Sequence, residues 1–246
     1  MYDSIRSMER DGKISKATAD AFTGTADRQM QMPPLHAVAY DPQFICVLLD
    51  QSGSMKPLRE AVIEGHAEVI NAFRKSATCR NNALFIAQYV FSGTSEPLNG
   101  FRPLSEHGND DVVRLTESNY TPAGVTALYQ TVHGMLQDTL MVVDHCGRNE
   151  GLAPSIYIML VTDGDDTEGK VDPADIRRCL TEMRDKGTLG IAGVLGVLSD
   201  KLTPQQLENI RATLGFDVVI PAGATAKELR DAMGQFSKSI ADRLGK

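Results

Sequence analysis

The sequence predicts an α/β fold: a doubly wound, mostly parallel sheet with one antiparallel edge strand and helices on both faces. Three observations support this class. Short apolar runs alternate along the chain with longer segments whose apolar residues recur at helical spacing. The apolar runs lack the alternation of a solvent-facing strand, which is typical of strands covered on both faces. The segments between them are long enough for right-handed crossover helices, which parallel pairing requires.

The first strand is predicted at residues 44–49, where apolar residues follow one another without a break. This strand ends at Asp50. Ser52 and Ser54 follow at alternate positions, and Gly53 between them permits a bend. A chain that leaves the strand in extended form aims these three oxygen-bearing side chains in one direction. One carboxylate and two hydroxyls suit a hard cation, because oxygen ligands favour magnesium, calcium or manganese over zinc or copper.

A helix and a hairpin are predicted next. Pro57 is expected at the first position of an amphipathic helix. The apolar stripe of this helix comprises Leu58, Val62, Gly65, Val69 and Phe73. Residues 83–91 predict the second strand, and residues 97–104 a short return strand with a turn at Gly100. The hairpin places an antiparallel strand at the edge of the sheet.

The second half of the chain continues the alternation. A helix of about five turns is predicted from Thr126 to about Cys146. Three further strands are predicted, at residues 155–162, 189–198 and 217–220. Gly193 and Gly196 are expected to interrupt the second of these.

Capping signals indicate where three later helices begin. Asp172 with Pro173 predicts an N-cap and a first helical position, and Gly187 closes that helix. Capping boxes start at Thr203 and Thr225. The final helix carries one apolar stripe, made of Leu229, Met233, Phe236, Ile240 and Leu244. This helix either closes the core or is a switch that slides by about one turn, roughly 5 Å.

The polar turn after the first strand resembles a known family motif. Asp-Gln-Ser-Gly-Ser at residues 50–54 resembles the Asp-x-Ser-x-Ser signature of the von Willebrand factor type A (VWA) domain. Residues 120–129 are similar to the threonine loop of that family, and residues 158–164 to the strand that ends in its second aspartate. The resemblance covers roughly residues 43–245 and implies an intact metal-ion-dependent adhesion site (MIDAS). The metal ligands that it implies are Asp50, Ser52, Ser54, Thr126 and Asp163.

The charge of the implied site bears on what it could bind. Two carboxylates only balance a divalent cation, so the ion can still attract one more carboxylate. Mg²⁺ is the expected metal, with Ca²⁺ or Mn²⁺ as alternatives, and Mg²⁺ keeps about six oxygen ligands, some of them water. The resemblance implies that an Asp or Glu of a partner protein fills the open position. The expected function is a Mg²⁺-dependent protein interaction module.

Enzyme and calcium-loop interpretations fit less well. Phosphotransferases with a nucleophilic aspartate have a second Asp two residues later, where this chain has Ser52, and no Gly-x-Ser-x-Gly elbow occurs. The run at residues 163–168 fails the EF-hand pattern, since Glu168 and Ala174 stand where Gly and Glu are needed. Its acidic residues Asp165, Asp166 and Glu168 are expected to form a solvated rim. The histidines are dispersed and are expected at the surface or partly buried, in structural roles: His36, His66, His107, His133 and His145.

Alternative functions remain open beside the interaction module. One is a VWA subunit of an assembly with an AAA+ ATPase, or of a stress or defence system, as the family resemblance allows. The other, weaker one is a metal-dependent hydrolase. We expect no enzyme activity.

Composition and motifs disfavour several partner classes. The chain has 25 basic and 32 acidic residues, a net charge of −7, and no Lys/Arg cluster, which disfavours nucleic acid and anionic membranes. Its longest apolar run is far shorter than the roughly 20 residues of a membrane span. No Gly-x-x-x-x-Gly-Lys loop for nucleotide binding occurs.

The N-terminal residues and the cysteines indicate the domain organisation and the compartment. Residues 1–42 are polar and proline-bearing, and are expected to be an arm that is disordered, docked on a surface or used to bind a partner. Residues 43–246 are the predicted VWA domain. The first residues lack the apolar core of a secretory signal, and the 4 cysteines are widely scattered. We therefore expect reduced thiols and a cytoplasmic location.

Overall fold

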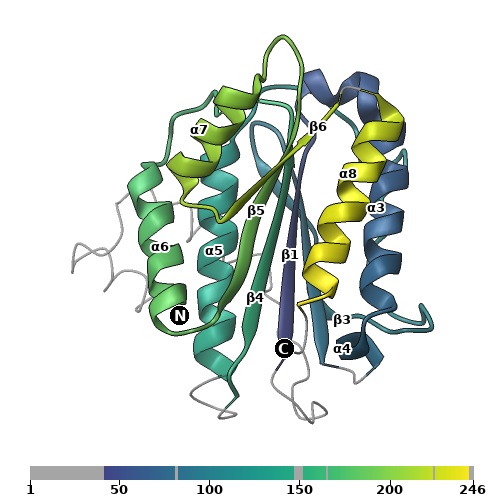
Figure 1. Ribbon diagram of the computed structural model, residues 1–246, viewed down its shortest axis with the longest axis vertical. Coiled ribbons are helices and arrows are strands. Elements are labelled where there is room, and N and C mark those ends of the chain that lie inside the picture. The colour runs from purple at the N-terminus through teal and green to yellow at the C-terminus, as the bar shows by residue number, and fades with distance from the viewer. Residues whose placement is uncertain (1–41, 81–82, 147–151, 165, 224, 244–246) are drawn as a thin grey trace.

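The predicted fold class is confirmed by a computed structural model, which describes residues 42–80, 83–146, 152–164, 166–223 and 225–243 (Figure 1). Its strands are β1 (Gln43–Asp50), β2 (Leu84–Phe91), β3 (Ser95–Pro103), β4 (Ser155–Thr162), β5 (Leu189–Val197) and β6 (Val218–Ala222). They form one six-stranded sheet in the order β3-β2-β1-β4-β5-β6. Neighbouring strands are parallel except for β2 and β3, which are antiparallel. The predicted arm, apart from Pro42, lies outside the described residues.

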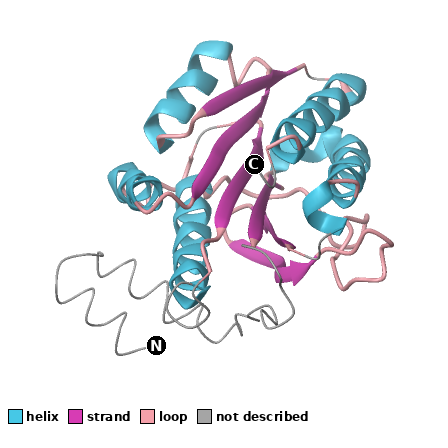
Figure 2. Cartoon of the chain, turned by 60° about the horizontal axis from the view of Figure 1, so that its bottom comes forward, coloured by secondary structure: helices cyan, strands magenta, loops and turns pink. Residues whose placement is uncertain are grey.

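Helices cover both faces of the sheet (Figures 1 and 2). They are the 3-10 helix η2 (Gly53–Leu58) and the α-helices α3 (Arg59–Arg74), α4 (Ala77–Arg80), α5 (Leu128–His145), α6 (Pro173–Asp185), α7 (Pro204–Leu214) and α8 (Ala226–Ala241). One face carries α5, α6 and α7, and the other carries α3 and α8. None of the helices in the described part of the chain is both long and apolar enough to cross a membrane.

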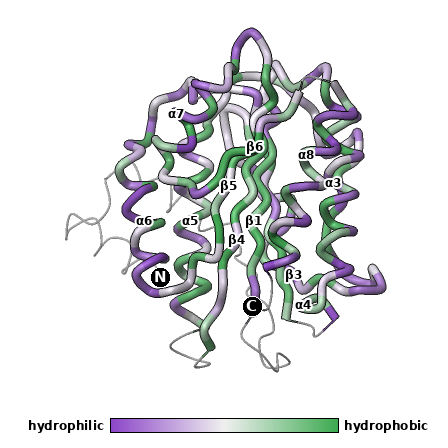
Figure 3. The backbone as a smooth tube through the Cα atoms, viewed as in Figure 1, coloured by the Kyte–Doolittle hydropathy of each residue, from purple (hydrophilic) through white to green (hydrophobic). Residues whose placement is uncertain are grey.

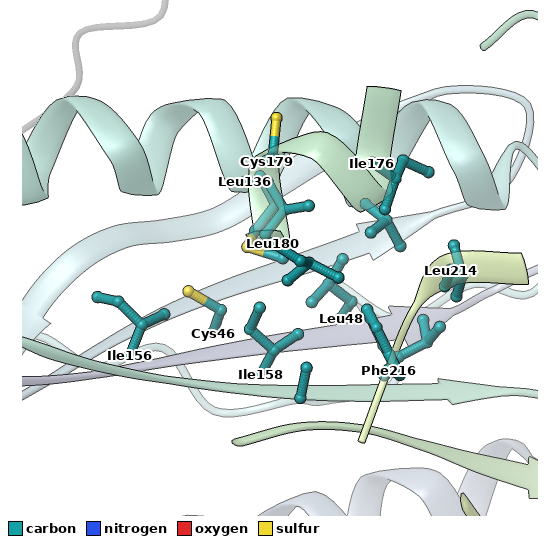
Figure 4. Packing of buried hydrophobic residues seen from close by; sticks show 14 of the residues in the cluster. Cys46, Leu48, Leu136, Ile156, Ile158, Ile176, Cys179, Leu180, Leu214 and Phe216 are labelled. Carbon is teal, nitrogen blue, oxygen red and sulfur yellow. The ribbon is translucent and has the colours of Figure 1, made fainter. Parts of the chain in front are cut away.

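The core has two halves, because successive side chains of a strand point to opposite faces. From β1, the side chains in the half under α5, α6 and α7 are Phe44, Cys46 and Leu48. The side chains in the half under α3 and α8 are Ile45, Val47 and Leu49. Figure 4 shows Cys46 and Leu48 with the side chains of Leu136 from α5 and Leu180 from α6. The hydropathy colours of Figure 3 show apolar strands between helices with hydrophilic outer sides.

The two glycines in β5 do not interrupt the strand, which corrects the prediction. The strand continues through both, and each lies where a helix side chain presses against the sheet. A Cβ at Gly193 would lie 2.4 Å from Cζ of Phe236 in α8, and one at Gly196 would lie 2.3 Å from Cδ1 of Leu207 in α7. The glycines therefore let α8 and α7 approach the sheet closely.

Two other local predictions are wrong in position. The turn of the hairpin lies at residues 92–94, and Gly100 lies inside β3. A register shift lies beside Gly100: Ile86 pairs with Arg102, but Gln88 pairs with Asn99. Three residues of β3 thus span two of β2, as in a β-bulge. Pro57 lies inside η2, and the long helix begins afterwards at Arg59.

The helix caps bear out the capping signals. Asp172 accepts a hydrogen bond from the Ala174 amide, and Thr203 and Thr225 form complete capping boxes. Thr126, by contrast, does not open α5, which begins two residues later at Leu128. The stripe of α8 is buried over its described residues, and Leu244 lies outside them.

Candidate metal centre

The candidate site lies at the middle of the sheet, between β1 and β4, where the order in which successive strands are added reverses direction. From β1 the sheet continues to β2 on one side, while β4 pairs with the other side of β1 and leads on to β5. Asp50 is the last residue of β1, and Asp163 directly follows β4. Such a switch point leaves a crevice at the carboxyl ends of the strands, where open α/β sheets bind ligands.

The Asp50 carboxylate is buried and held at both oxygens. Its Oδ1 accepts a hydrogen bond from the Ser52 amide at 2.7 Å. Its Oδ2 accepts one from the Thr162 hydroxyl at 2.6 Å. Thr162 is the last residue of β4, so this bond joins the two central strands at their carboxyl ends. Thr162 has no predicted role in the sequence motif, since only its place at the end of a neighbouring strand brings it here.

Two serines connect the two aspartates, Ser52 by its amide to Asp50 and Ser54 by its hydroxyl to Asp163. Oγ of Ser52 lies 3.1 Å from Oγ of Ser54, which donates a hydrogen bond to Oδ1 of Asp163 at 2.8 Å. Four of the five predicted site residues therefore belong to one connected group. The group draws on the turn after β1 and on the end of β4, which are more than 100 residues apart in the chain.

Within the described residues, Thr126 is not bonded to this group, and its main chain bonds the loop after β4 instead. Its amide donates to Oγ1 of Thr167 at 2.9 Å, and its carbonyl accepts from the Thr167 amide at 2.9 Å. Just before it, the Gly124 carbonyl accepts from the Gly53 amide at 3.1 Å. The threonine loop is thus fixed both to the turn after β1 and to the loop after β4. The side-chain hydrogen bonds that join the other four residues do not extend to Thr126 in the described structure.

The electrostatics of the site are unbalanced. Burial raises the pKa of the Asp50 carboxyl, against hydrogen bonds from Thr162 and Ser52 that lower it, and the negative charge of Asp163 raises it further. Burial also raises the pKa of Asp163, opposed by the hydrogen bond from Ser54 and by the charge of Lys201. Two carboxylates that lose solvation beside each other are stabilised as anions by a cation between them.

The donor set suits a hard cation. It consists of carboxylate and hydroxyl oxygens, with no nitrogen or sulfur, which is the chemistry of Mg²⁺ rather than of Zn²⁺. Among the described residues, no group of three or more His, Cys, Asp or Glu side chains is placed to hold a metal. Any metal held at this site would therefore depend on the serine and threonine hydroxyls as well as on the two aspartates.

The acidic loop after β4 is more structured than predicted. Asp166 is not simply a solvated rim residue: its Oδ1 accepts from the Tyr129 amide at 3.1 Å and its Oδ2 from the Gly169 amide at 2.6 Å. It thereby caps α5, whose own N-cap residue, Ala127, makes no side-chain cap. Glu168 pairs with Lys170, and Asp165 lies outside the described residues.

Tyr120 supports the site and was not predicted to do so. Its side chain is fully buried, and its hydroxyl donates to the main-chain carbonyl of Asp50 at 2.5 Å. Arg59 Nε donates to the Tyr120 carbonyl at 3.0 Å, and the same guanidinium bonds the Glu117 carbonyl. Burial, then the charges of Asp50 and Asp163, raise the pKa of Tyr120 well above its ordinary value. An aromatic residue in a polar loop was the only signal for this role in the sequence.

A second buried polar network holds the long loop between β3 and α5. The His66 ring hydrogen-bonds Oε1 of Gln88, and its Nδ1 accepts from the Leu115 amide at 3.4 Å. Gln88 Nε2 donates to Oδ1 of Asn99 at 2.6 Å and to the Val113 carbonyl at 2.8 Å. His66 is therefore wholly buried rather than partly exposed, and burial lowers its pKa to about 4.

Comparison with known proteins shows the fold. No family model matches the chain, and a search of curated proteins finds no match. Among solved structures, the chain is similar to the VWA domain of SpRpn10, with 11% identity over 79% of this chain and 95% of that one, at a TM-score of 0.51. It is similar to proximal thread matrix protein 1 from the mussel byssus with a zinc-occupied MIDAS motif, with 16% identity over 82% of this chain and a TM-score of 0.52.

A third similar structure is the pilus adhesin SpaC from Lactobacillus rhamnosus GG, with 13% identity over 82% of this chain and a TM-score of 0.54. The chain spans 46% of the mussel protein and 30% of the adhesin. At these identities the likeness concerns the fold alone. The chain has the Rossmann-like fold of VWA domains.

Proposed function

We propose that this chain is a protein interaction module that holds Mg²⁺ at the carboxyl edge of its sheet and uses the ion to bind an acidic residue of a partner. The proposed ligands are Asp50, Ser52, Ser54, Thr126 and Asp163. The observation that carries the proposal is the serine chain between the aspartates, in which Ser54 Oγ lies 3.1 Å from Ser52 Oγ and 2.8 Å from Asp163, and the Ser52 amide bonds Asp50. It brings together oxygen ligands from two distant parts of the sequence.

The burial of the two aspartates supports a bound cation. Asp50 is fully buried and Asp163 is 6% exposed, and burial raises the pKa of both. A buried pair of carboxylates is unfavourable unless it is protonated or paired with positive charge. The VWA fold adds support, because a structure with this fold, the mussel thread protein, has a zinc-occupied MIDAS motif.

We propose an acidic partner residue because of the charge of the metal ion and the number of ligands it takes. A bound Mg²⁺ would have a coordination position open for one more oxygen ligand. The two aspartates neutralise a divalent ion without over-neutralising it, so a further carboxylate is attracted rather than repelled. Asp50 is turned inward by Thr162 and the Ser52 amide, which leaves the outer side of the site for the partner.

We propose an interaction role rather than catalysis. The hydroxyls of Ser52 and Ser54 bond each other and Asp163, and not a histidine that could act as a base. His66 is engaged by Gln88 and Leu115 on the face under α3, so it is not available to the site. As part of the same proposal, nucleotide, nucleic acid and membrane are not ligands of this module.

The same proposal includes a reducing compartment such as the cytoplasm. Cys46, Cys79 and Cys179 are buried and form no disulfide. Burial raises the pKa of their thiols, to about 12 for Cys46 and about 11 for the other two. Such thiols remain protonated and unreactive, which suits a chain that does not depend on disulfides.

Calorimetric titration of the full chain with Mg²⁺ tests the metal site. We expect saturable binding that Asp163→Ala abolishes and Ser54→Ala weakens. Asp231→Ala, which removes an exposed aspartate from α8, is the matched control and should bind like the parent chain. Equal Mg²⁺ affinity in the parent and in Asp163→Ala would rule out the proposed site.

A pull-down with the full chain as bait, in Mg²⁺ and in EDTA, tests the acidic partner. We expect proteins that are retained in Mg²⁺ and released by EDTA, and that Asp163→Ala bait does not retain. Partners that stay bound in EDTA and on the variant would show an interaction surface independent of the metal.

A further inference from the structure

The exposed apolar surface next to the site is confined to one side chain. Among the described residues, Val125 is the large hydrophobic residue that is exposed, at 46%. It directly precedes Thr126, one of the proposed ligands. Isolated surface valines are ordinary, but here the exposed valine stands beside the crevice that the fold marks as a binding site.

The loop holds Val125 in an outward position. The Ala123 amide donates to the Gln51 carbonyl at 2.8 Å, and the Gly124 carbonyl accepts from the Gly53 amide. After the valine, the Thr126 amide donates to Thr167 at 2.9 Å. Gly124 has φ +80°, a conformation that glycine adopts without strain. The backbone is thus fixed on both sides of Val125, so that its exposure is built into the loop.

Gly93 lies next to the Val125 side chain and, having no Cβ, leaves room for it. A Cβ on Gly93 would lie 3.2 Å from Cγ2 of Val125, closer than an ordinary contact. Gly93 follows β2, whereas the proposed ligands follow β1 and β4. The valine therefore stands on the β2 side of the site.

An exposed lysine, Lys201, lies on the other side of the site. It belongs to the loop after β5, at the same carboxyl edge of the sheet as Asp163. In the loop after β4, Asp166 caps α5 and Glu168 pairs with Lys170, so these two acids are engaged within the chain. Asp200, which directly precedes Lys201, is exposed. Since the strand order is β2-β1-β4-β5, Val125 and Lys201 flank the site across three strand spacings, about 14 Å.

We propose that Val125 and Lys201 form a two-sided rim that selects the residues flanking the partner's acidic side chain. The partner is a protein segment with a central Asp or Glu, an aliphatic or aromatic residue toward Val125 and a second acidic residue toward Lys201. A stretch of about four to five extended residues spans the rim. This inference rests on the proposed metal-dependent function, and it assigns specificity to residues outside the metal ligands.

Selection from a random peptide library tests the rim. The probe is a displayed library of ten-residue peptides, and the full chain is the bait in Mg²⁺, with elution by EDTA. We expect enrichment of acidic peptides that carry an aliphatic or aromatic residue within two positions of the acid on one side. With Val125→Ser as bait, the apolar preference should disappear while the acidic preference remains. With Lys201→Ala, the preference for a second acid should weaken.

Affinities of one enriched peptide make the test quantitative. Val125→Ser should weaken binding by about three- to tenfold, the loss expected for one half-buried aliphatic contact. Gly93→Ala, which crowds the valine without removing it, should weaken binding less. Lys238→Ala, an exposed lysine at the far end of α8, is the control for Lys201→Ala and should leave the affinity unchanged.

Two results overturn the inference in distinguishable ways. If acidic peptides are enriched without apolar neighbours, or if Val125→Ser selects the same peptides as the parent, the rim has no role although the metal site stands. If EDTA elutes no acidic peptides from the parent chain, and Asp163→Ala gives the same result, the proposed function itself fails and the rim with it.

Discussion

Two buried polar networks in this domain differ in charge, and the difference indicates which one is built to bind. The network of His66, Gln88 and Asn99 is neutral, and its groups find partners within the chain. The network that joins Asp50 to Asp163 through two serines holds two carboxyl groups, and among the described residues none of its hydrogen bonds comes from a cationic side chain. The charge of Lys201 acts on Asp163 and offsets only part of this negative charge. A self-satisfied neutral network stabilises one conformation. A network with unbalanced charge costs stability until a ligand balances it.

The largest effect is expected from breaking the neutral network. His66→Ala leaves the Leu115 amide and the Gln88 side chain without partners and opens a cavity beside α3. We expect a loss of about 3–4 kcal/mol in the free energy of unfolding, measured by denaturant titration. The loss should be the same in Mg²⁺ and in EDTA, because this network is not a metal site. A much larger loss in one of the two conditions would contradict the division between the networks.

The opposite dependence on metal is expected at the site. In the parent chain, Mg²⁺ at a hundred times its Kd should raise the free energy of unfolding by about 2.7 kcal/mol. Asp163→Asn should remove this gain and, in EDTA, should leave the stability unchanged or raised, since it removes one of two buried negative charges. The measurement is denaturant titration with and without Mg²⁺. A strong destabilisation of Asp163→Asn in EDTA would mean that the carboxylate is structural.

Acid should affect the two networks with opposite sign. Burial lowers the pKa of His66 to about 4, below its unfolded value of 6.5, so its contribution to stability is lost as the pH falls from about 6.5 to 4. Burial raises the pKa of Asp50 and Asp163, so stability from these groups is gained as the pH falls and they protonate. Without metal, the parent should therefore show a shallow pH profile between pH 7 and 4.

A histidine variant separates the two slopes. His66→Gln should lose the acid-sensitive contribution, so that its stability in EDTA rises toward pH 4 relative to the parent. Unfolding free energies at pH 7 and pH 4.5 measure this. If the unfolding free energies of His66→Gln and of the parent change equally with pH, burial does not lower the pKa of His66 as we expect.

The sequence was sufficient for the parts of the fold that depend on local chemistry. Residues 155–162 were predicted as a strand at the bounds that the structure has, because a continuous apolar run leaves little choice. Thr203 and Thr225 were recognised as caps because a capping box is complete within four residues. The connection of Asp50 with Asp163 followed from the rule that ligands gather at the carboxyl ends of parallel strands.

Other features were misread because their partners are distant in sequence. Gly193 and Gly196 look like interruptions, and only the approach of α8 and α7 explains them. Asp166 looks like a surface acid until the first turn of α5 is placed against it. The bond from Tyr120 to the Asp50 carbonyl is likewise invisible in a linear pattern. Supporting residues are therefore the part of a site that sequence reasoning most easily misses.

Tyr120 allows a smaller test of how the site is supported. Tyr120→Phe keeps the buried ring and removes the hydroxyl that donates to the Asp50 carbonyl. We expect about 1 kcal/mol less stability and a severalfold lower Mg²⁺ affinity, because the turn that carries the ligands loses one anchor. Calorimetric titration gives the affinity. An unchanged affinity with reduced stability would mean that Tyr120 stabilises the core without setting the geometry of the site.

The smallest effect is expected for the last helix, which could close the core or slide as a switch. The side chain of Phe236 fits against Gly193, where a Cβ would lie 2.4 Å from its ring, and Met233 approaches Gly65 in α3. If α8 slid by one turn, about 5.4 Å, Phe236 would move away from Gly193 and Met233 would move away from Gly65. Their side chains would then meet residues that have side chains of their own. Side chains that fit into glycine gaps thus oppose a shift that uniform apolar contacts would permit. We therefore expect α8 to be static.

A reversible crosslink tests this expectation. The position of a Cβ on Gly65 is 3.6 Å from Cγ of Arg230, which makes Gly65→Cys with Arg230→Cys a candidate disulfide. The same Cβ would lie 2.6 Å from Sδ of Met233, so the Met233 side chain must shift in both forms of the variant. Mg²⁺ affinity and binding of an acidic peptide should be the same in the oxidised and reduced forms of this double variant. Coupling between sites is typically worth 1–3 kcal/mol. A change of fivefold or more on oxidation would therefore show that α8 is linked to the metal site, and that its contacts with the glycines exchange more easily than their close fit implies.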